Sequence, residues 1–116
     1  MATPIRRALV AGLTGRLYER PARAFARRHA GAGGRGYRYL LSWGPQANPF
    51  RAAHTTDLPL LFSNRRAWEA MPTVTGVSWS DVERDGREVR RLWAAFARTG
   101  RLPESSGGRF LRFEAM

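Results

Sequence analysis

GAGGRGYRYLLSW, residues 31–43, decides the fold expected for this chain, because it joins the end of a helix to the start of a strand. The preceding PARAFARRHA, residues 21–30, predicts a helix, and the glycines of GAGGRG predict its end and a turn. YRYLLSW, residues 37–43, combines aromatic and aliphatic residues between glycines and predicts a largely buried strand. A helix that feeds a strand through a short turn is half of an α/β unit, so the expected fold class is α/β.

The residues before this stretch predict an earlier helical segment. Thr3 followed by Pro4 is a plausible helix start, because proline is tolerated where the first N–H has no partner. Gly12 and Gly15 predict an interruption, after which Pro21 opens the second helix.

The residues after the stretch predict a loop that carries a histidine. GPQANPF, residues 44–50, leads the chain to His54. Thr56 and Asp57 are placed to cap a short helix over residues 58–62. Residues 63–79 predict no regular structure.

A long helix is predicted next. Ser80 and Glu83 have the S-x-x-E spacing of a capping box at its start. One apolar stripe at helical spacing consists of Val89, Leu92, Trp93 and Phe96. Gly86 weakens the early part of this helix, and Gly100 followed by Pro103 predicts its end.

The last segment, GRFLRFEAM, residues 108–116, predicts a short strand. The predicted order is therefore helix, strand, histidine loop, helix, long helix and short strand. A length of 116 residues fits one small domain with one modest core.

The formal net charge of +11 comes from arginine alone, since all twenty basic residues are Arg. Four of them, Arg16, Arg20, Arg23 and Arg27, follow helical spacing and form a charged stripe. We interpret this stripe as the solvated face of an amphipathic helix, because no nucleic-acid-binding motif accompanies it. We expect no specific nucleic-acid partner, although a small polyanion-binding module is an alternative interpretation.

Other classes of site are disfavoured by composition. The chain has no cysteine, so disulfides, thiolate metal sites and a cysteine nucleophile are excluded. Its two histidines accompany no spaced pair of carboxylates, and His29 fits the C-terminal end of a helix, so we expect no metal and no cofactor. No run of about 18 apolar residues occurs, so we expect no membrane partner.

RAAHTTDLPLLF, residues 51–62, resembles the histidine segment of the type-B carboxylesterases, an α/β-hydrolase family that includes cholinesterases and para-nitrobenzyl esterases. That segment runs small-small-His-small-x-acid-Leu-Pro-x-x-Phe, and the residues that fit are Ala52, Ala53, His54, Thr55, Asp57, Leu58, Pro59 and Phe62. YRYLLSW resembles the strand before that histidine, and YERPARAFARRHA, residues 18–30, resembles the helix before that strand. LWAAFARTGRLP, residues 92–103, resembles the family's W-x-x-F-A-x-x-G-x-P helix.

The resemblance covers most of residues 14–103 and implies specific roles. His54 would be the general base of a Ser-His-acid triad, and Asp57 would support it by local hydrogen bonding or helix capping. The triad acid and the G-x-S-x-G nucleophile of the family lie upstream of the histidine, and no serine here has the G-x-S-x-G setting. The resemblance therefore implies that residues 1–116 are a partial, C-terminal α/β-hydrolase domain.

Three functions follow as hypotheses. The first is a portion of a carboxylic ester hydrolase that is inactive alone and binds an ester substrate only when completed. The second is a complementing chain, with serine and acid on a separate polypeptide. The third is the polyanion-binding module. Whether the chain is itself an enzyme is left open, and so is its location, which a true start at Met1 would make cytoplasmic.

Overall fold

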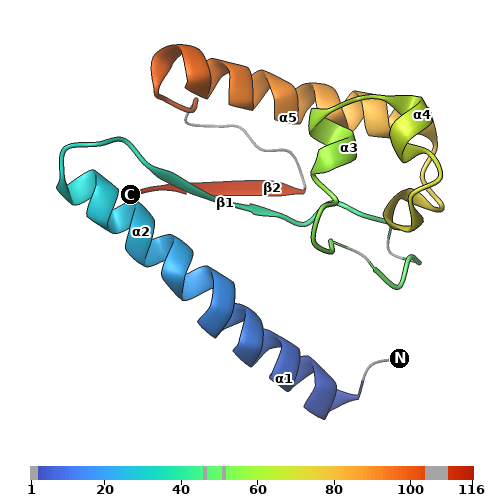
Figure 1. Cartoon of the computed structure of the whole chain (residues 1–116), viewed down its shortest axis with the longest axis horizontal. Helices are drawn as coiled ribbons and strands as arrows, with labels where there is room; N and C mark the ends of the chain where they lie inside the picture. The colour runs from blue at the N-terminus through green and yellow to red at the C-terminus, as the bar shows by residue number, and fades with distance from the viewer. Residues whose placement is uncertain (1–2, 46, 51, 104–109) are drawn as a thin grey trace. The chain divides into compact units, whose positions relative to one another are not determined.

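The computed structural model describes residues 3–45, 47–50, 52–103 and 110–116. Its elements are α1 (Pro4–Thr14), a π-helical turn (Gly15–Glu19), α2 (Arg20–Gly31), β1 (Tyr37–Leu41), α3 (Leu58–Leu61), α4 (Arg65–Trp68), a 3₁₀ turn (Pro72–Val74), α5 (Trp79–Thr99) and β2 (Leu111–Ala115) (Figure 1). They divide into two compact units, Met1–Arg38 with Glu114–Met116, and Tyr39–Phe113. None of the described helices is long and apolar enough to cross a membrane.

The first unit begins with one continuous helical stretch, α1 to α2. Thr3 Oγ1 accepts a hydrogen bond from the Arg6 amide at 3.3 Å, which confirms the predicted start. The predicted interruption at Gly12 and Gly15 is wrong, because the backbone passes through the π-helical turn without leaving the helical region. We attribute this turn to Pro21, which follows it closely and has no N–H to donate.

The end of α2 confirms the predicted glycine turn. The Gly34 amide donates a hydrogen bond to the His29 carbonyl at 3.0 Å, and Gly33 has a φ of 86°. A β-carbon at Gly34 would overlap the imidazole of His29. Glycine at position 34 therefore lets the chain turn back closely over the last turn of the helix.

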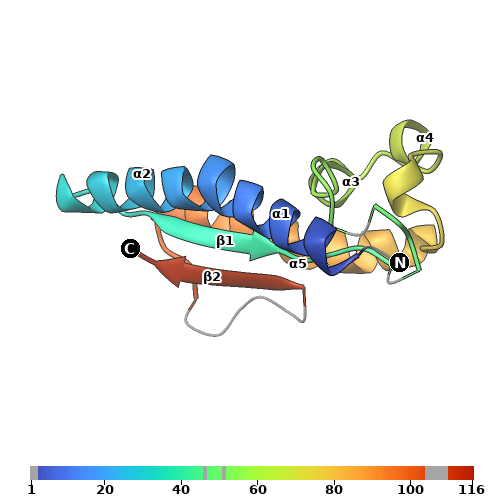
Figure 2. The same ribbon diagram turned by 90° about the horizontal axis from the view of Figure 1, so that it is seen from below.

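The two strands pair in an antiparallel sheet, as the opposite arrows in Figure 2 show. The Ser42 amide donates to Phe110 O at 2.7 Å, and the Met116 amide donates to Gly36 O at 3.0 Å. Both predicted strands are thus present, but the predicted burial of the first is wrong in its middle. Tyr39 and Leu40 are 43% and 47% exposed, and since successive side chains of a strand point to opposite faces, neither face of the two-stranded sheet is fully covered there.

The second unit has its own core. Its buried cluster consists of Trp43, Leu60, Val74, Val82 and Val89. Helix α3 packs directly on α5 (Figure 1). Gly86 permits this approach, since a β-carbon there would lie 2.7 Å from Leu60 O and 3.2 Å from Leu60 Cα. Gly86 was expected only to weaken the long helix, and the structure shows that it is a buried packing position.

The long helix α5 starts earlier than predicted. Its N-cap is Ser78, whose Oγ accepts a hydrogen bond from the Asp81 amide at 3.2 Å, so the predicted cap at Ser80 is wrong. Residues 63–79 are more regular than predicted, since they contain α4 and the 3₁₀ turn. The predicted end is confirmed, because Gly100 has a φ of 65° and its amide bonds to Phe96 O.

Candidate functional site

The loop between β1 and α3 places His54 at the corner of a tight turn in the second unit. Ala53 O accepts two hydrogen bonds from Thr56, one from its amide at 3.3 Å and one from its Oγ1 at 2.7 Å. Thr56 is buried, whereas the His54 side chain is exposed. The buried Thr56 therefore holds the turn through its hydrogen bonds to Ala53, and the imidazole of His54 is exposed to solvent.

Thr55, the next residue after His54, has an unusual backbone conformation. Its φ is 73°, and among the described residues it is the one non-glycine with a positive φ. A β-branched side chain is unfavourable in this region, so the turn stores strain next to the histidine. Strained backbone of this kind is concentrated at functional sites, where the surrounding structure maintains it.

The core of the second unit holds this turn through α3. Pro59 and Leu60, which follow the turn, are both buried. Arg90 of α5 donates a hydrogen bond from Nη1 to Leu60 O at 2.6 Å, and its Nη2 lies 3.4 Å from Glu83 Oε2. The segment that follows the histidine turn is therefore attached to α5, and the point of attachment, Leu60, lies only a few residues after His54 in the sequence.

Asp57 does not have the capping role that was expected. It occupies the N-cap of α3, but its side chain makes no capping hydrogen bond, and the hydroxyl of Thr56 bonds to Ala53 O instead. Its charge acts on Tyr39 of β1. The partial burial of Tyr39 raises the pKa of its phenol, and the carboxylate of Asp57 raises that pKa further. No pattern in the sequence indicated this pairing of a strand tyrosine with the loop acid.

In the described ranges, no hydrogen bond or ion pair joins the His54 ring to another side chain, Asp57 and the four described serines included. Ser42 Oγ donates to Phe110 O, and Ser78 bonds to Ser80 and Asp81. Ser105 and Ser106 lie outside the described residues. The structure thus brings no nucleophile and histidine together in the part it describes.

Two further contacts of the second unit were not predicted. Asp85 accepts a hydrogen bond on Oδ2 from Nε1 of the buried Trp43 at 2.9 Å, which ties the end of the first strand to α5. Tyr39 packs edge-on against Trp93, with ring centroids 6.1 Å apart. Trp43 is a core residue as expected, whereas Trp93 of the predicted apolar stripe is half exposed.

The other candidate groups lie apart from the histidine turn in sequence. The arginines of the predicted stripe are exposed at positions 16, 20 and 27, while Arg23 lies 3.6 Å from Glu114 in an ion pair. His29 is at the end of α2, as predicted. The described residues contain no cluster of three or more His, Cys, Asp or Glu that could hold a metal ion.

Comparison with known proteins relates this chain to a hydrolase. The relative is a protein of Rhodococcus erythropolis described as "probable N-octanoylanthranilate hydrolase", which is 34% identical over 88 residues, or 76% of this chain. An 88-residue stretch of a 116-residue chain includes residues 29–88 wherever it begins, so the similarity includes the histidine turn. The chain spans 19% of the length of that relative. No family model and no solved structure matches the chain.

Proposed function

We propose that this chain is the C-terminal part of a type-B carboxylesterase-like α/β hydrolase and supplies its catalytic histidine, His54. The observation that carries the proposal is the turn at His54. An exposed imidazole at the corner of a strained, core-anchored turn lies within the stretch that is similar to a hydrolase. The order helix, strand, histidine loop and long helix supports the same proposal.

The proposed chemistry is acyl transfer through a serine. His54 takes the proton of the serine hydroxyl as that oxygen attacks the ester carbonyl, and then gives the proton to the departing alcohol. Water hydrolyses the acyl-serine by the same proton transfers in reverse order, which releases the carboxylic acid. The serine and the acid that orients the imidazole are supplied by polypeptide other than the residues described for this chain.

The N-terminal helical stretch supports a need for that additional polypeptide. Its large apolar residues that are more than half exposed are Ile5, Leu9, Val10, Leu13, Leu17, Tyr18 and Phe25. Complete burial of one such side chain is favourable by about 1.5–3 kcal/mol, so a partner surface would gain much from covering them. We propose that the serine-bearing part of the hydrolase covers this surface, either on the same polypeptide or on a complementing chain.

The name of the relative guides the choice of substrate. That protein is described as acting on N-octanoylanthranilate, an octanoyl group joined to an aromatic amine. We propose that the assembly containing this chain acts on esters of a carboxylic acid with an apolar chain, with aryl amides as a second class to test. No cofactor is part of this mechanism.

The test is complementation. The chain is mixed with a G-x-S-x-G-bearing hydrolase polypeptide from the same genome, and hydrolysis of para-nitrophenyl octanoate is followed. We expect activity that His54→Ala lowers by at least about a thousandfold, because the triad acts as a unit. His29→Ala, which removes the other histidine, is the matched control and should retain activity. Full activity of the His54→Ala assembly would exclude His54 as the base.

The exposed arginines favour one second candidate, the polyanion-binding module. This function predicts binding of a DNA duplex that weakens steeply with salt, without any ester hydrolysis in the assembly. A glutamine replacement of Arg16, Arg20 and Arg27 together would then lower both the affinity and its salt dependence.

A further inference from the structure

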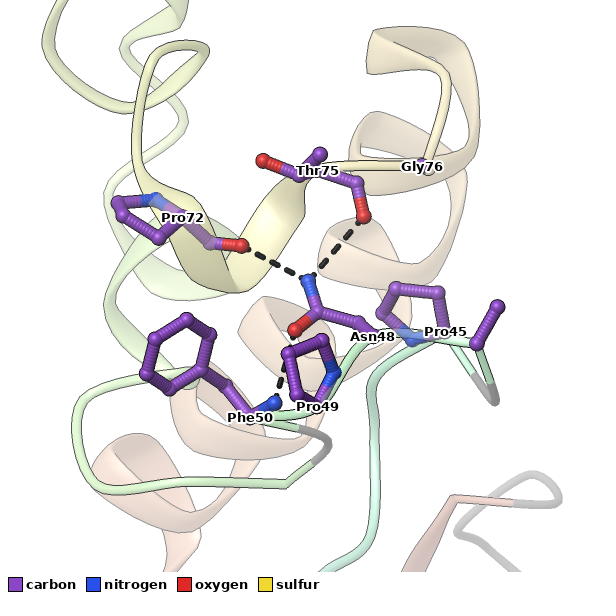
Figure 3. Close-up of a pocket in the computed structure, with 8 residues that line it drawn as sticks. Pro45, Asn48, Pro49, Phe50, Pro72, Thr75 and Gly76 are labelled. Atoms are coloured by element: carbon purple, nitrogen blue, oxygen red, sulfur yellow. Dashed lines mark hydrogen bonds between the residues drawn. The ribbon is translucent and has the colours of Figure 1, made fainter. Parts of the chain in front are cut away.

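A pocket lies in the second unit between the loop that leads to His54 and the segment around the 3₁₀ turn (Figure 3). Its volume is about 400 Å³. The described residues that line it are Pro45, Ala47, Asn48, Pro49, Phe50, Pro72, Thr75 and Gly76. This volume falls within the range of roughly 300–1,000 Å³ that small-molecule sites occupy.

Asn48 joins the two segments that form the pocket walls, the loop that leads to His54 and the segment around the 3₁₀ turn. Its Nδ2 donates to Pro72 O at 2.7 Å and to Thr75 O at 3.1 Å, and its Oδ1 accepts from the Phe50 amide at 2.9 Å (Figure 3). Asn48 is only 5% exposed, so these bonds are shielded from water. The three prolines of the lining restrict the backbone further, and the walls are therefore held in place before any ligand arrives.

The chemistry of the lining selects an uncharged apolar ligand. None of the described residues that line the pocket carries a charge. The carbonyls of Pro72 and Thr75 and the Phe50 amide are already bonded to Asn48, and proline nitrogens have no hydrogen to donate. A polar or charged ligand would find few of these groups free to replace its hydrogen bonds to water, whereas a hydrocarbon group has no such bonds to lose.

The pocket is open to ligands at its rim. Phe50 is 54% exposed although its side chain is large and apolar. A β-carbon at Gly76 would have no atom within 4 Å, so space is free on that side. Phe50 also precedes His54 by four residues, which limits the distance between their Cα atoms to at most about 14 Å.

We propose that this pocket binds the hydrocarbon arm of the ester on which His54 acts. The inference rests on the proposed function, since it assigns the pocket to the substrate of that same histidine. Either the acyl chain or the alkyl chain of the ester has the required chemistry, and the experiments below distinguish these two sources.

The first experiment measures binding without hydrolysis. The ¹⁵N-labelled chain is titrated with 1-octanol, and amide shifts are followed by NMR. We expect saturable shifts at Asn48, Phe50 and Gly76, which Ala47→Phe weakens by at least tenfold because the new ring fills the pocket. Ala70→Phe, at an exposed position outside the lining, is the matched control and should bind 1-octanol normally. Shifts confined to Leu9, Leu13 and Phe25 of the exposed helical stretch would overturn the proposal.

The second experiment uses the complemented assembly. Para-nitrophenyl octanoate is compared with para-nitrophenyl acetate, and octyl acetate with methyl acetate. If the acyl chain occupies the pocket, Ala47→Phe lowers the octanoate-to-acetate ratio of kcat/KM about tenfold; if the alkyl chain does, it lowers the octyl-to-methyl ratio instead. Unchanged ratios would overturn the pocket assignment.

The His54→Ala variant separates the two proposals. It should abolish hydrolysis of all four esters while 1-octanol still binds to the chain. Binding of 1-octanol at Asn48 and Gly76 without hydrolysis by any assembly would contradict the proposed function and the ester assignment, but would retain an apolar site. Hydrolysis that depends on His54 without binding of 1-octanol would support the proposed function and contradict the assignment of the pocket to the hydrocarbon arm of the ester.

Discussion

Nε1 of Trp43 donates a 2.9 Å hydrogen bond to Oδ2 of Asp85, and this bond joins the segment that follows β1 to the N-terminal part of α5. The indole is buried, and Asp85 also accepts from Nε of Arg84 at 3.0 Å. A buried donor that loses its acceptor retains the cost of its desolvation. The pair therefore stabilises the core from which the histidine loop departs.

Asp85→Ala should lower the free energy of unfolding by about 1.5–3 kcal/mol, because it leaves the Trp43 N–H without its charged acceptor. Urea denaturation followed by tryptophan fluorescence measures this change. Asp85→Asn, which keeps an acceptor oxygen, should lose less than half as much. An equal loss in the two variants would show that the hydrogen bond is not the source of the effect.

Gly86→Ala should destabilise the second unit although alanine is the better helix former. The new β-carbon would meet Leu60 O at 2.7 Å, and overpacking of this kind costs about 1–3 kcal/mol. Gly12→Ala in α1 is the matched control, since nothing lies within 4 Å of its β-carbon. It should increase helix stability by up to about 1 kcal/mol. Denaturation and circular dichroism would report both effects, and a stabilising Gly86→Ala would contradict the close approach of α3 and α5.

Thr55→Gly should stabilise the histidine turn by up to about 1.5 kcal/mol. Relief of the left-handed strain gains about 1–2 kcal/mol, and the added freedom of glycine in the unfolded chain removes about 0.5–1 kcal/mol of it. Thr75→Gly is the control at a φ of −58°, where the substitution has only the entropic cost. Denaturation midpoints decide the comparison. Equal losses for the two variants would mean that Thr55 is unstrained.

The start of α5 should contribute an acid-sensitive stability. Hydrogen bonds from Ser78 and then Arg84 hold the pKa of the Asp81 carboxyl below its ordinary value of 3.8. Because the folded-state pKa is lowered, this contribution is present above pH 3.8 and is lost as the pH falls through the folded-state pKa. An NMR titration of the Asp81 carboxyl should show the low pKa directly.

Ser78→Ala tests the same site by removal of the cap. It should raise the pKa of Asp81 toward 3.8 and cost about 1 kcal/mol of stability at neutral pH. Ser80→Ala, at the position where the sequence pattern predicted the cap, should have the smaller effect on both quantities. A larger loss in Ser80→Ala would contradict the start of the helix seen here.

Local patterns in the sequence were sufficient where the structure is decided by neighbouring residues. Thr3, the glycines after His29 and Gly100 each control the backbone within a few positions, and each prediction is confirmed. The patterns failed where two local signals competed. Ser78 and Ser80 both precede acidic residues at the capping spacing, and only the backbone conformation of Ser78 makes it the cap.

The candidate site divides in the same way. The sequence was sufficient to single out His54 as the candidate residue and to place it in a loop, since both inferences depend on a short motif. The φ of Thr55 and the pairing of Tyr39 with Asp57 were not, because each depends on how the loop is held by the core. The roles of His54 and Asp57 in catalysis stay predictions.

The sequence by itself determined the two strands, the N-terminal helices, the short helix α3 and the end of the long helix, although not α4. It also contained the resemblance that directs attention to His54. Only the tertiary structure decided that Gly86 is a packing position against Leu60, that Asn48 joins two walls of a pocket and that the middle of β1 is exposed. The physical reason is separation along the chain. Asn48 bonds to residues 24 and 27 positions away, and Gly86 meets a helix that precedes it by more than twenty residues. Local propensities act over one or two turns and carry no information about such contacts.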